Sequence, residues 1–192
     1  MVRSDAVSTL IQRTLEPLPG CASRLGGVLL AQLDDQSRRL QVATRDLTPD
    51  ELAWQPGPGQ NSTGMLLAHI ARVEVDWAGF GILRRPMDGT DVIPLTEHQI
   101  GMPLPRDGAA PAEFAGRPLE YFDDLLARAR AFTKATVAPL TDEALERSFR
   151  VPWDQDELEA NASFVVYHVM AHLALHRGQI ALLRHQYRDR DA

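Results

Sequence analysis

Residues 167–180 read Tyr167-His-Val-Met-Ala-His-Leu-Ala-Leu-His-Arg-Gly-Gln-Ile180 and decide the fold class. Their apolar side chains recur every three or four positions, which is the period of an amphipathic helix. Because side chains four residues apart stack on one side of a helix, His168, His172 and His176 form a ladder. Two imidazoles one turn apart form a two-point clamp for a metal ion. A third ligand from another segment would complete a site with open positions, and His69 is the obvious candidate.

The length predicts one domain over residues 1–192, with an N-terminal extension at 1–20. The single cysteine, Cys21, excludes an internal disulfide, so nothing points to an oxidising compartment. The net charge is −6, and no basic stripe is present that would neutralise nucleic acid phosphates. The first residues lack the pattern of a signal peptide, and no apolar run is long enough to span a bilayer. We therefore expect a soluble cytoplasmic protein with no nucleic acid partner and no membrane contact.

Helical periodicity dominates the chain, and we find no convincing run of alternating β-branched residues. Four long amphipathic helices are predicted, at about 22–46, 63–83, 118–137 and from 158 or 163 to 187. Good N-cap residues precede two of the helical starts, Thr48 before a short helix and Asn61-Ser62 before the second long one. A short helix is also predicted at 4–16, and residues 149–156 are expected to be irregular. The economical architecture is an all-α fold, a four-helix bundle.

The segment 84–117 is rich in proline and glycine and shows no sustained period. A connection of this length inside a compact domain is usually a functional loop or a crossover. We predict that it crosses over between the second and third long helices, which would then run parallel. Hairpins would join the first long helix to the second and the third to the fourth.

The angular positions of the histidines select three of them as a metal site. On the last helix, with about 100° per residue, His176 lies inside the apolar stripe and His172 at its edge. His168 lies on the flank, farther from the core. On the second long helix, His69 shares the buried face with Leu66, Val73 and Phe80. The predicted ligands are therefore His69, His172 and His176, with His168 as a neighbour of the site.

Other residues near this face receive mostly structural interpretations. Asp76 is interpreted as an ion-pair partner, with orientation of an imidazole or proton transfer as the alternative. Glu74 is expected at the surface, and Arg177 in an ion pair between helices. Gln179 lies on the His172 side, within reach of a ligand histidine. Core or rim packing is expected of the aromatic side chains Trp54, Trp77 and Tyr167.

Several stretches resemble a known family: Asp46-Leu-Thr-Pro-Asp-Glu-Leu-Ala-Trp54, Asn61-Ser-Thr-Gly-Met-Leu-Leu-Ala-His-Ile-Ala-Arg-Val-Glu-Val-Asp-Trp77 and His172-Leu-Ala-Leu-His-Arg-Gly-Gln-Ile180. They are similar to the DinB/YfiT-like superfamily of metal-binding four-helix bundles, which includes thiol-dependent S-transferases and maleylpyruvate isomerases. The most specific piece is His-x-x-x-His-Arg-Gly-Gln. The family binds a divalent ion through one histidine on helix two and two on helix four. The matching positions here are His69, His172 and His176, and the resemblance also implies a homodimer.

Three neutral imidazoles would leave a bound ion its double charge and an open position. Zinc or nickel is expected there, with iron and manganese as alternatives. Water on such an ion is acidified toward neutral pH, and a thiol loses its proton. We therefore expect a metal-dependent thiol S-transferase or hydrolase acting on a small molecule, with a low-molecular-weight thiol as the expected partner. The alternatives are a non-catalytic, metal-stabilised module for stress-response binding or assembly, and a metal-free bundle whose histidines only pack.

Overall fold

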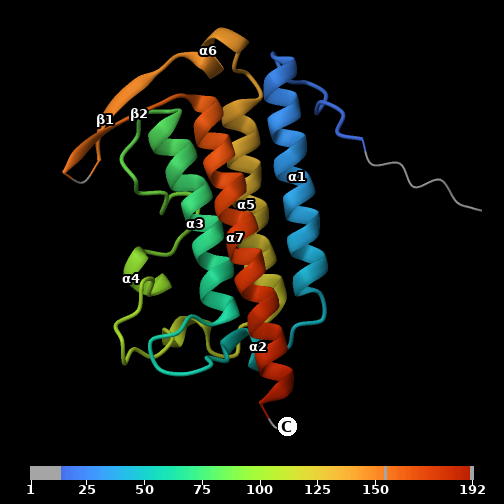
Figure 1. Cartoon of the computed structure of the whole chain (residues 1–192), viewed down its shortest axis with the longest axis vertical. Helices are drawn as coiled ribbons and strands as arrows, with labels where there is room; N and C mark the ends of the chain where they lie inside the picture. Colours follow the sequence, from blue (N-terminus) through green and yellow to red (C-terminus); the bar gives the residue numbers. More distant parts are fainter. Residues whose placement is uncertain (1–13, 154, 191–192) are drawn as a thin grey trace, which may run out of the picture.

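The computed structural model describes residues 14–153 and 155–190 and is mostly helical (Figure 1). Its long helices are α1 (Arg24–Thr44), α3 (Thr63–Gly81), α5 (Leu119–Val137) and α7 (Ala162–Asp189). The shorter elements are α2 (Pro49–Ala53), α4 (Glu97–Ile100), the 3-10 helix η1 (Ala112–Phe114), α6 (Asp142–Glu146), β1 (Phe149–Trp153) and β2 (Asp156–Ala160). All four predicted long helices are present, within a few residues of their predicted bounds. Within the two described ranges, none of the helices is long and apolar enough to cross a membrane.

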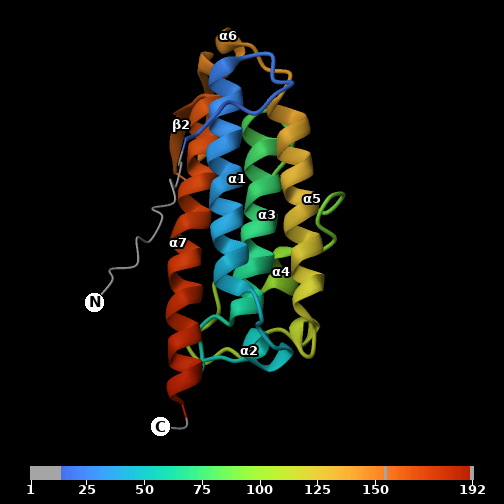
Figure 2. The same cartoon turned by 90° about the vertical axis from the view of Figure 1, so that its right-hand side faces the viewer.

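The four long helices lie side by side, with α2 at one end and α6 at the other (Figures 1 and 2). α3 packs against α5 and α7, and α7 also packs against α1. α3 and α5 run in one direction and α1 and α7 in the opposite one, as the long crossover predicts (Figure 1). The prediction pairs α1 with α3 and α5 with α7 as hairpins. These pairs are not the main packed neighbours, because α1 packs mainly on α7 and α5 packs mainly on α3. The reason is that α3 already has α5 and α7 as its neighbours.

The ends of the helices follow from local capping chemistry. Three long helices begin after a side chain that accepts a hydrogen bond from a first-turn N–H: Ser23 from Gly26 at 3.1 Å, Ser62 from Met65 at 3.3 Å and Asn161 from Phe164 at 2.9 Å. α5 begins directly after Pro118 without a side-chain cap. Thr48 caps α2 in a reciprocal capping box with Glu51, so this predicted cap is confirmed. The predicted helix at 4–16 falls outside the described residues except for 14–16, which are irregular.

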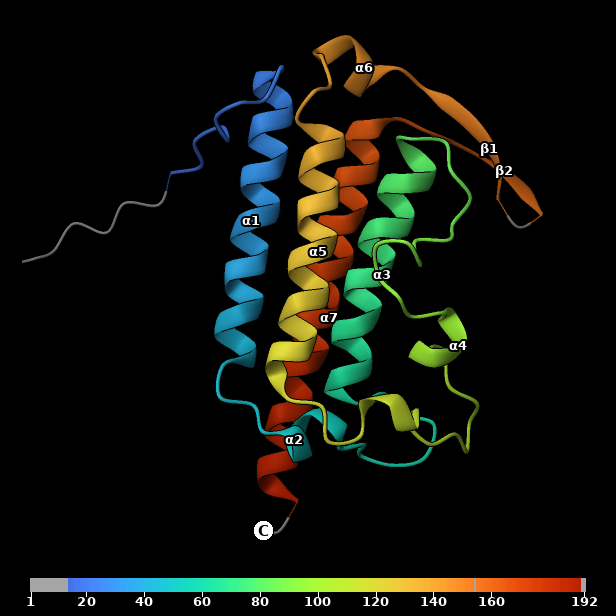
Figure 3. The same cartoon turned by 180° about the vertical axis from the view of Figure 1, so that it is seen from behind.

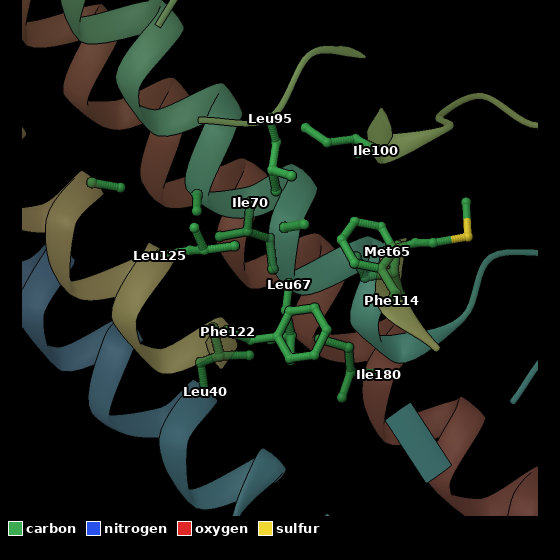
Figure 4. Close-up of a cluster of buried hydrophobic side chains, with 14 of the residues drawn as sticks. Leu40, Met65, Leu67, Ile70, Leu95, Ile100, Phe114, Phe122, Leu125 and Ile180 are labelled. Carbon is green, nitrogen blue, oxygen red and sulfur yellow. The ribbon is translucent and has the colours of Figure 1, made fainter. Parts of the chain in front are cut away.

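The crossover between α3 and α5 is packed into the core. Leu95, Ile100 and Phe114 of this segment are almost completely buried and point toward Ile70 and Met65 of α3 (Figure 4). Burial of apolar side chains is the main favourable term in folding. The crossover is therefore held against α3 along its length.

A buried ion pair on α3 also holds the crossover. Asp76 accepts hydrogen bonds from Arg72 Nε at 2.9 Å and 2.8 Å and from the backbone N–H of Gly89 at 2.9 Å. Arg72 in turn donates to the carbonyl of Leu95. Both side chains are buried, so this pairing satisfies charges that would otherwise be costly. The predicted ion-pair role of Asp76 is confirmed, and its carboxylate faces the crossover.

A second, partly buried network joins α1, α3 and α5. Glu74 is only 2% exposed, so its predicted surface position is wrong. Its two carboxylate oxygens accept from Arg130 Nε at 2.8 Å and Nη2 at 2.9 Å, and Arg130 also contacts Asp34 at 3.3 Å. Lys134 pairs with the other Asp34 oxygen at 2.7 Å. Burial opposes the charge on Arg130, but the carboxylates of Glu74 and Asp34 raise its pKa above the usual value.

An antiparallel hairpin follows α6, where the sequence predicts an irregular segment. Phe149 of β1 lies opposite Ala160 of β2, and Trp153 lies opposite Asp156. Figure 3 shows the hairpin beside the end of α3 nearest α6. The guanidinium of Arg84 lies 3.4 Å above the centroid of the Phe149 ring and fixes the base of the hairpin. The prediction of an irregular segment at 149–156 is therefore wrong: Phe149, Val151 and Trp153 alternate with Arg150 and Pro152, but over too few positions to be recognised as a strand.

The charge of Glu74 should be a main contributor to stability. We expect Glu74→Gln to lower the free energy of unfolding by about 3 kcal/mol, because it leaves the buried Arg130 without its bidentate partner. Urea denaturation followed by circular dichroism measures this loss. The matched control is Glu143→Gln in the exposed pair with Arg147, which should cost less than about 1 kcal/mol. Equal losses in the two variants would show that the buried network does not stabilise the fold.

Candidate metal centre

The structure brings together the three histidines selected from the sequence. His69 comes from α3, and His172 and His176 come from α7. The Nε2 atom of His172 lies 3.1 Å from Nε2 of His69 and 2.9 Å from Nε2 of His176. The ring centroids are separated by 4.9 Å, 5.1 Å and 4.3 Å for the pairs 69–172, 69–176 and 172–176. All three candidate donor atoms lie within 4.8 Å of one another.

The register of α3 against α7 explains why these side chains meet. A Cβ atom on Gly81 would lie 2.4 Å from a methyl of Val165, so glycine allows the end of α3 to touch the start of α7. The two helices are antiparallel, and each rises about 1.5 Å per residue. Counted from the contact of Gly81 with Val165, His69 lies about twelve residues earlier in α3. The turn that contains His176 lies about twelve residues later in α7, at a matching distance along the helix. One close contact at the helix ends thus aligns the histidines.

A hydrogen bond from His176 to Gln179 fixes the orientation of one ring. The Oε1 atom of Gln179 lies 2.7 Å from Nδ1 of His176, so this nitrogen donates the hydrogen bond. In the neutral ring, Nε2 of His176 then carries a lone pair and faces Nε2 of His172. The sequence-based interpretation that Gln179 reaches a ligand histidine is consistent with this contact.

The remaining nitrogen contacts cannot all be hydrogen bonds between neutral rings. Nε2 of His172 faces both His69 and His176, but a neutral ring carries at most one proton on that atom. One proton can make a good hydrogen bond to only one of these two neighbours. A cation at the point where the three Nε2 atoms meet would instead accept all three lone pairs. The donor set therefore fits a metal ion better than it fits a hydrogen-bonded cluster.

Burial keeps the imidazoles neutral, as metal ligation requires. Desolvation, with a further contribution from the charge of His176, lowers the pKa of His69 to about 4. Desolvation and the three other histidines lower the pKa of His172 to about 3. Burial also lowers the pKa of His176, although its hydrogen bond to Gln179 opposes the shift. At neutral pH the three lone pairs are thus free of protons.

The observed spacing suits a small divalent ion. Zinc lies about 2.0 to 2.1 Å from imidazole nitrogens, so tetrahedral ligand atoms are separated by roughly 3.3 Å. The two separations from Nε2 of His172, 2.9 Å and 3.1 Å, would need to open by only a few tenths of an ångström, and all three donor atoms lie within 4.8 Å of one another. Three ligands would leave at least one coordination position for water or substrate.

A cavity of about 290 Å³ opens beside His69. Its walls come from the loop before α3 and from the crossover: Gly59, Asn61, Met102, Pro103 and Leu104. Sequence reasoning identified the crossover as a segment able to cover the site but named none of these wall residues. The only available signal was the length and the proline and glycine content of the crossover.

The other candidate residues lie outside the cluster. His168 packs its ring on Trp77 with 4.0 Å between centroids, as expected for a neighbour of the site. Asp76 and Glu74 face the crossover and α5, respectively. Arg177 forms no ion pair with any residue of 14–153 or 155–190, so the predicted pair is wrong within this part of the chain. Core or rim packing is found for Trp77, which is buried, and for Trp54, whose ring meets Tyr187 edge-on at 5.6 Å.

Comparisons with known proteins agree with the architecture. The crystal structure of a conserved protein from Enterococcus faecalis superposes with a TM-score of 0.59 at 20% sequence identity, covering 82% of this chain and 93% of that one. At this identity the likeness concerns the fold alone. No curated protein matches the sequence. The family model for mycothiol S-transferases matches residues 28–189, which is most of the chain and includes all three clustered histidines. The protein therefore belongs to the mycothiol S-transferase family, within the DinB/YfiT-like superfamily.

Proposed function

We propose that the protein binds one divalent metal ion through His69, His172 and His176 and transfers a low-molecular-weight thiol to a small electrophile. The observation that carries this proposal is the convergence of three Nε2 atoms whose contacts neutral rings cannot satisfy alone. The name of the family indicates mycothiol as the thiol. Zinc or nickel is the proposed ion, with iron and manganese as alternatives. The proposed architecture is the four-helix bundle of this superfamily, and the homodimer and the cytoplasmic location stay predictions.

Each part of the site has a defined task in this reaction. A divalent ion, when bound, would supply a positive charge that deprotonates the thiol near neutral pH. His69, His172 and His176 would hold it as neutral ligands, and Gln179 would keep the His176 ring turned toward it. The cavity beside His69 is the proposed place for the thiol. Asn61 supplies a polar side chain on the wall of that cavity.

Metal binding should depend on the clustered histidines and not on histidine content in general. Wild-type protein, stripped with a chelator and dialysed against zinc, should retain one equivalent by elemental analysis. His172→Ala should retain much less than one equivalent of zinc, because only two of the three proposed imidazole ligands remain. The control is His185→Ala, an exposed histidine on the same helix, which should retain the full equivalent. Stoichiometric zinc in His172→Ala would refute the proposed ligand set.

The hydrogen bond from His176 to Gln179 should strengthen metal binding. Loss of such a partner typically weakens metal affinity about 10-fold to 100-fold. We expect Gln179→Leu to show this decrease in competition titrations with a zinc-binding dye. Gln186→Leu, an exposed position two turns farther along α7, should leave the affinity unchanged. An equal effect of the two substitutions would mean that Gln179 has no specific role.

Turnover tests the reaction itself. Metal-loaded protein should accelerate the conjugation of mycothiol to an electrophile such as 1-chloro-2,4-dinitrobenzene, measured by absorbance of the thioether. His172→Ala should reduce the rate to that of the uncatalysed reaction, whereas His185→Ala should not change it. Metal-loaded protein that hydrolyses esters but conjugates no thiol would overturn thiol transfer in favour of hydrolysis. Bound metal without any turnover would favour a non-catalytic module.

A further inference from the structure

Three rings pack in series along the contact between α3 and α7, beside the histidine cluster. Trp77 of α3 lies against His168 of α7, with centroids 4.0 Å apart and planes inclined by 35°. Trp153 of β1 lies against Trp77 at 5.2 Å and 43°. We refer to Trp77, His168 and Trp153 as the aromatic strip. The hairpin therefore contributes a tryptophan to a row of rings that begins on the two helices of the histidine cluster.

The aromatic strip adjoins the proposed metal centre. The His168 ring lies one helical turn from His172, with 6.3 Å between centroids and only 23° between planes. His168 forms no hydrogen bond to any residue within 14–153 or 155–190. Its ring nitrogens thus offer a polar contact at the junction of strip and cluster. A molecule lying on the strip would therefore lie beside His168, one helical turn from His172.

The strip is exposed at its hairpin end, where Asp156 of β2 lies opposite Trp153. Trp153 is 40% exposed although it is a large apolar side chain on a hairpin outside the main core. Phe164, 39% exposed, extends the surface at 6.4 Å from Trp77. From Ala162 to His176, α7 contains no aspartate, glutamate, lysine or arginine. The uncharged α7 side of this surface favours a flat, neutral ring that can stack on tryptophan and histidine.

We propose that the aromatic strip binds the electrophilic substrate and selects acceptors that carry a flat, uncharged aromatic ring. This inference rests on the proposed thiol transfer, for which it names the class of acceptor. The acceptor ring stacks against Trp153 and His168, so that its reactive carbon points toward the thiol sulfur at the histidine cluster. With an aryl chloride, an S–C bond forms and the C–Cl bond breaks. Chloride leaves with the bonding electron pair, and the thiol proton passes to solvent.

The kinetic test compares an aromatic acceptor with a small aliphatic one. With metal-loaded protein and mycothiol, Trp153→Ala should raise KM for 1-chloro-2,4-dinitrobenzene about threefold to tenfold, the worth of one aromatic stacking contact. The value of kcat/KM for iodoacetamide should not change. Trp153→Phe should stay within about twofold of wild type for both acceptors, since a ring remains in place. Val42→Ala, at an exposed apolar site on α1, is the control that should change the kinetics with neither acceptor.

A binding measurement separates this inference from the proposed function. Metal-free, full-length protein is titrated with 1,3-dinitrobenzene, an aromatic probe without a leaving group, and binding is followed by the nuclear magnetic resonance of the ligand. Trp153→Ala and His168→Ala should each weaken binding severalfold, and Trp153→Phe and Val42→Ala should not. Weaker binding in Trp153→Ala and His168→Ala, together with no turnover by the metal-loaded protein, would support ring binding by the aromatic strip and contradict thiol transfer. Normal turnover together with unchanged binding in Trp153→Ala, or an equal loss for both acceptors, would overturn the strip and leave thiol transfer standing.

Discussion

The enclosure of α3 is the constraint on which the rest of the structure depends. α5, α7 and the crossover surround this helix, and nearly every residue from Thr63 to Gly81 is buried. A helix without a solvent side has no surface on which to place charges, so each charge on it requires a partner. Arg72 and Asp76 pair with each other and with the crossover backbone, and Glu74 pairs with Arg130 of α5. The charges that α3 must bury are therefore the same ones that orient its neighbours.

The long helices and the three histidines could be predicted because their signals are local. A cap such as Ser62 and the 3.6-residue period act over a few turns, and both survive in any tertiary context. The helical wheel placed His69, His172 and His176 on inward faces without knowledge of the packing. Their convergence follows once α3 and α7 pack against each other, which Gly81 permits at one end. Whether an ion occupies the cluster is a separate matter that helix periodicity does not address.

Glu74 shows where the same reasoning fails. A helical wheel assigns a charged residue to the solvent side because it assumes that one side faces solvent. On α3 that side is covered by α5, and the compensating Arg130 lies 56 positions away in the sequence. Helix neighbours were missed for a related reason: connection length suggests direction, but which helices touch depends on side-chain volumes across the whole core. The hairpin was missed because five-residue strands carry too few alternations to compete with helical signals around them.

The ladder on α7 shows how the opposite helix decides what a repeated residue does. His168, His172 and His176 have the same spacing and the same chemistry, and desolvation lowers the pKa of all three. They differ in what α3 presents to them. His69 faces His172 and His176, so their nitrogens meet a third nitrogen and form the candidate metal cluster. Trp77, two turns farther along α3, faces His168, so the His168 ring meets an indole and its nitrogens stay out of the cluster. The period of α7 supplies three equivalent positions, and the sequence of α3 divides them into two members of the histidine cluster and one stacking ring.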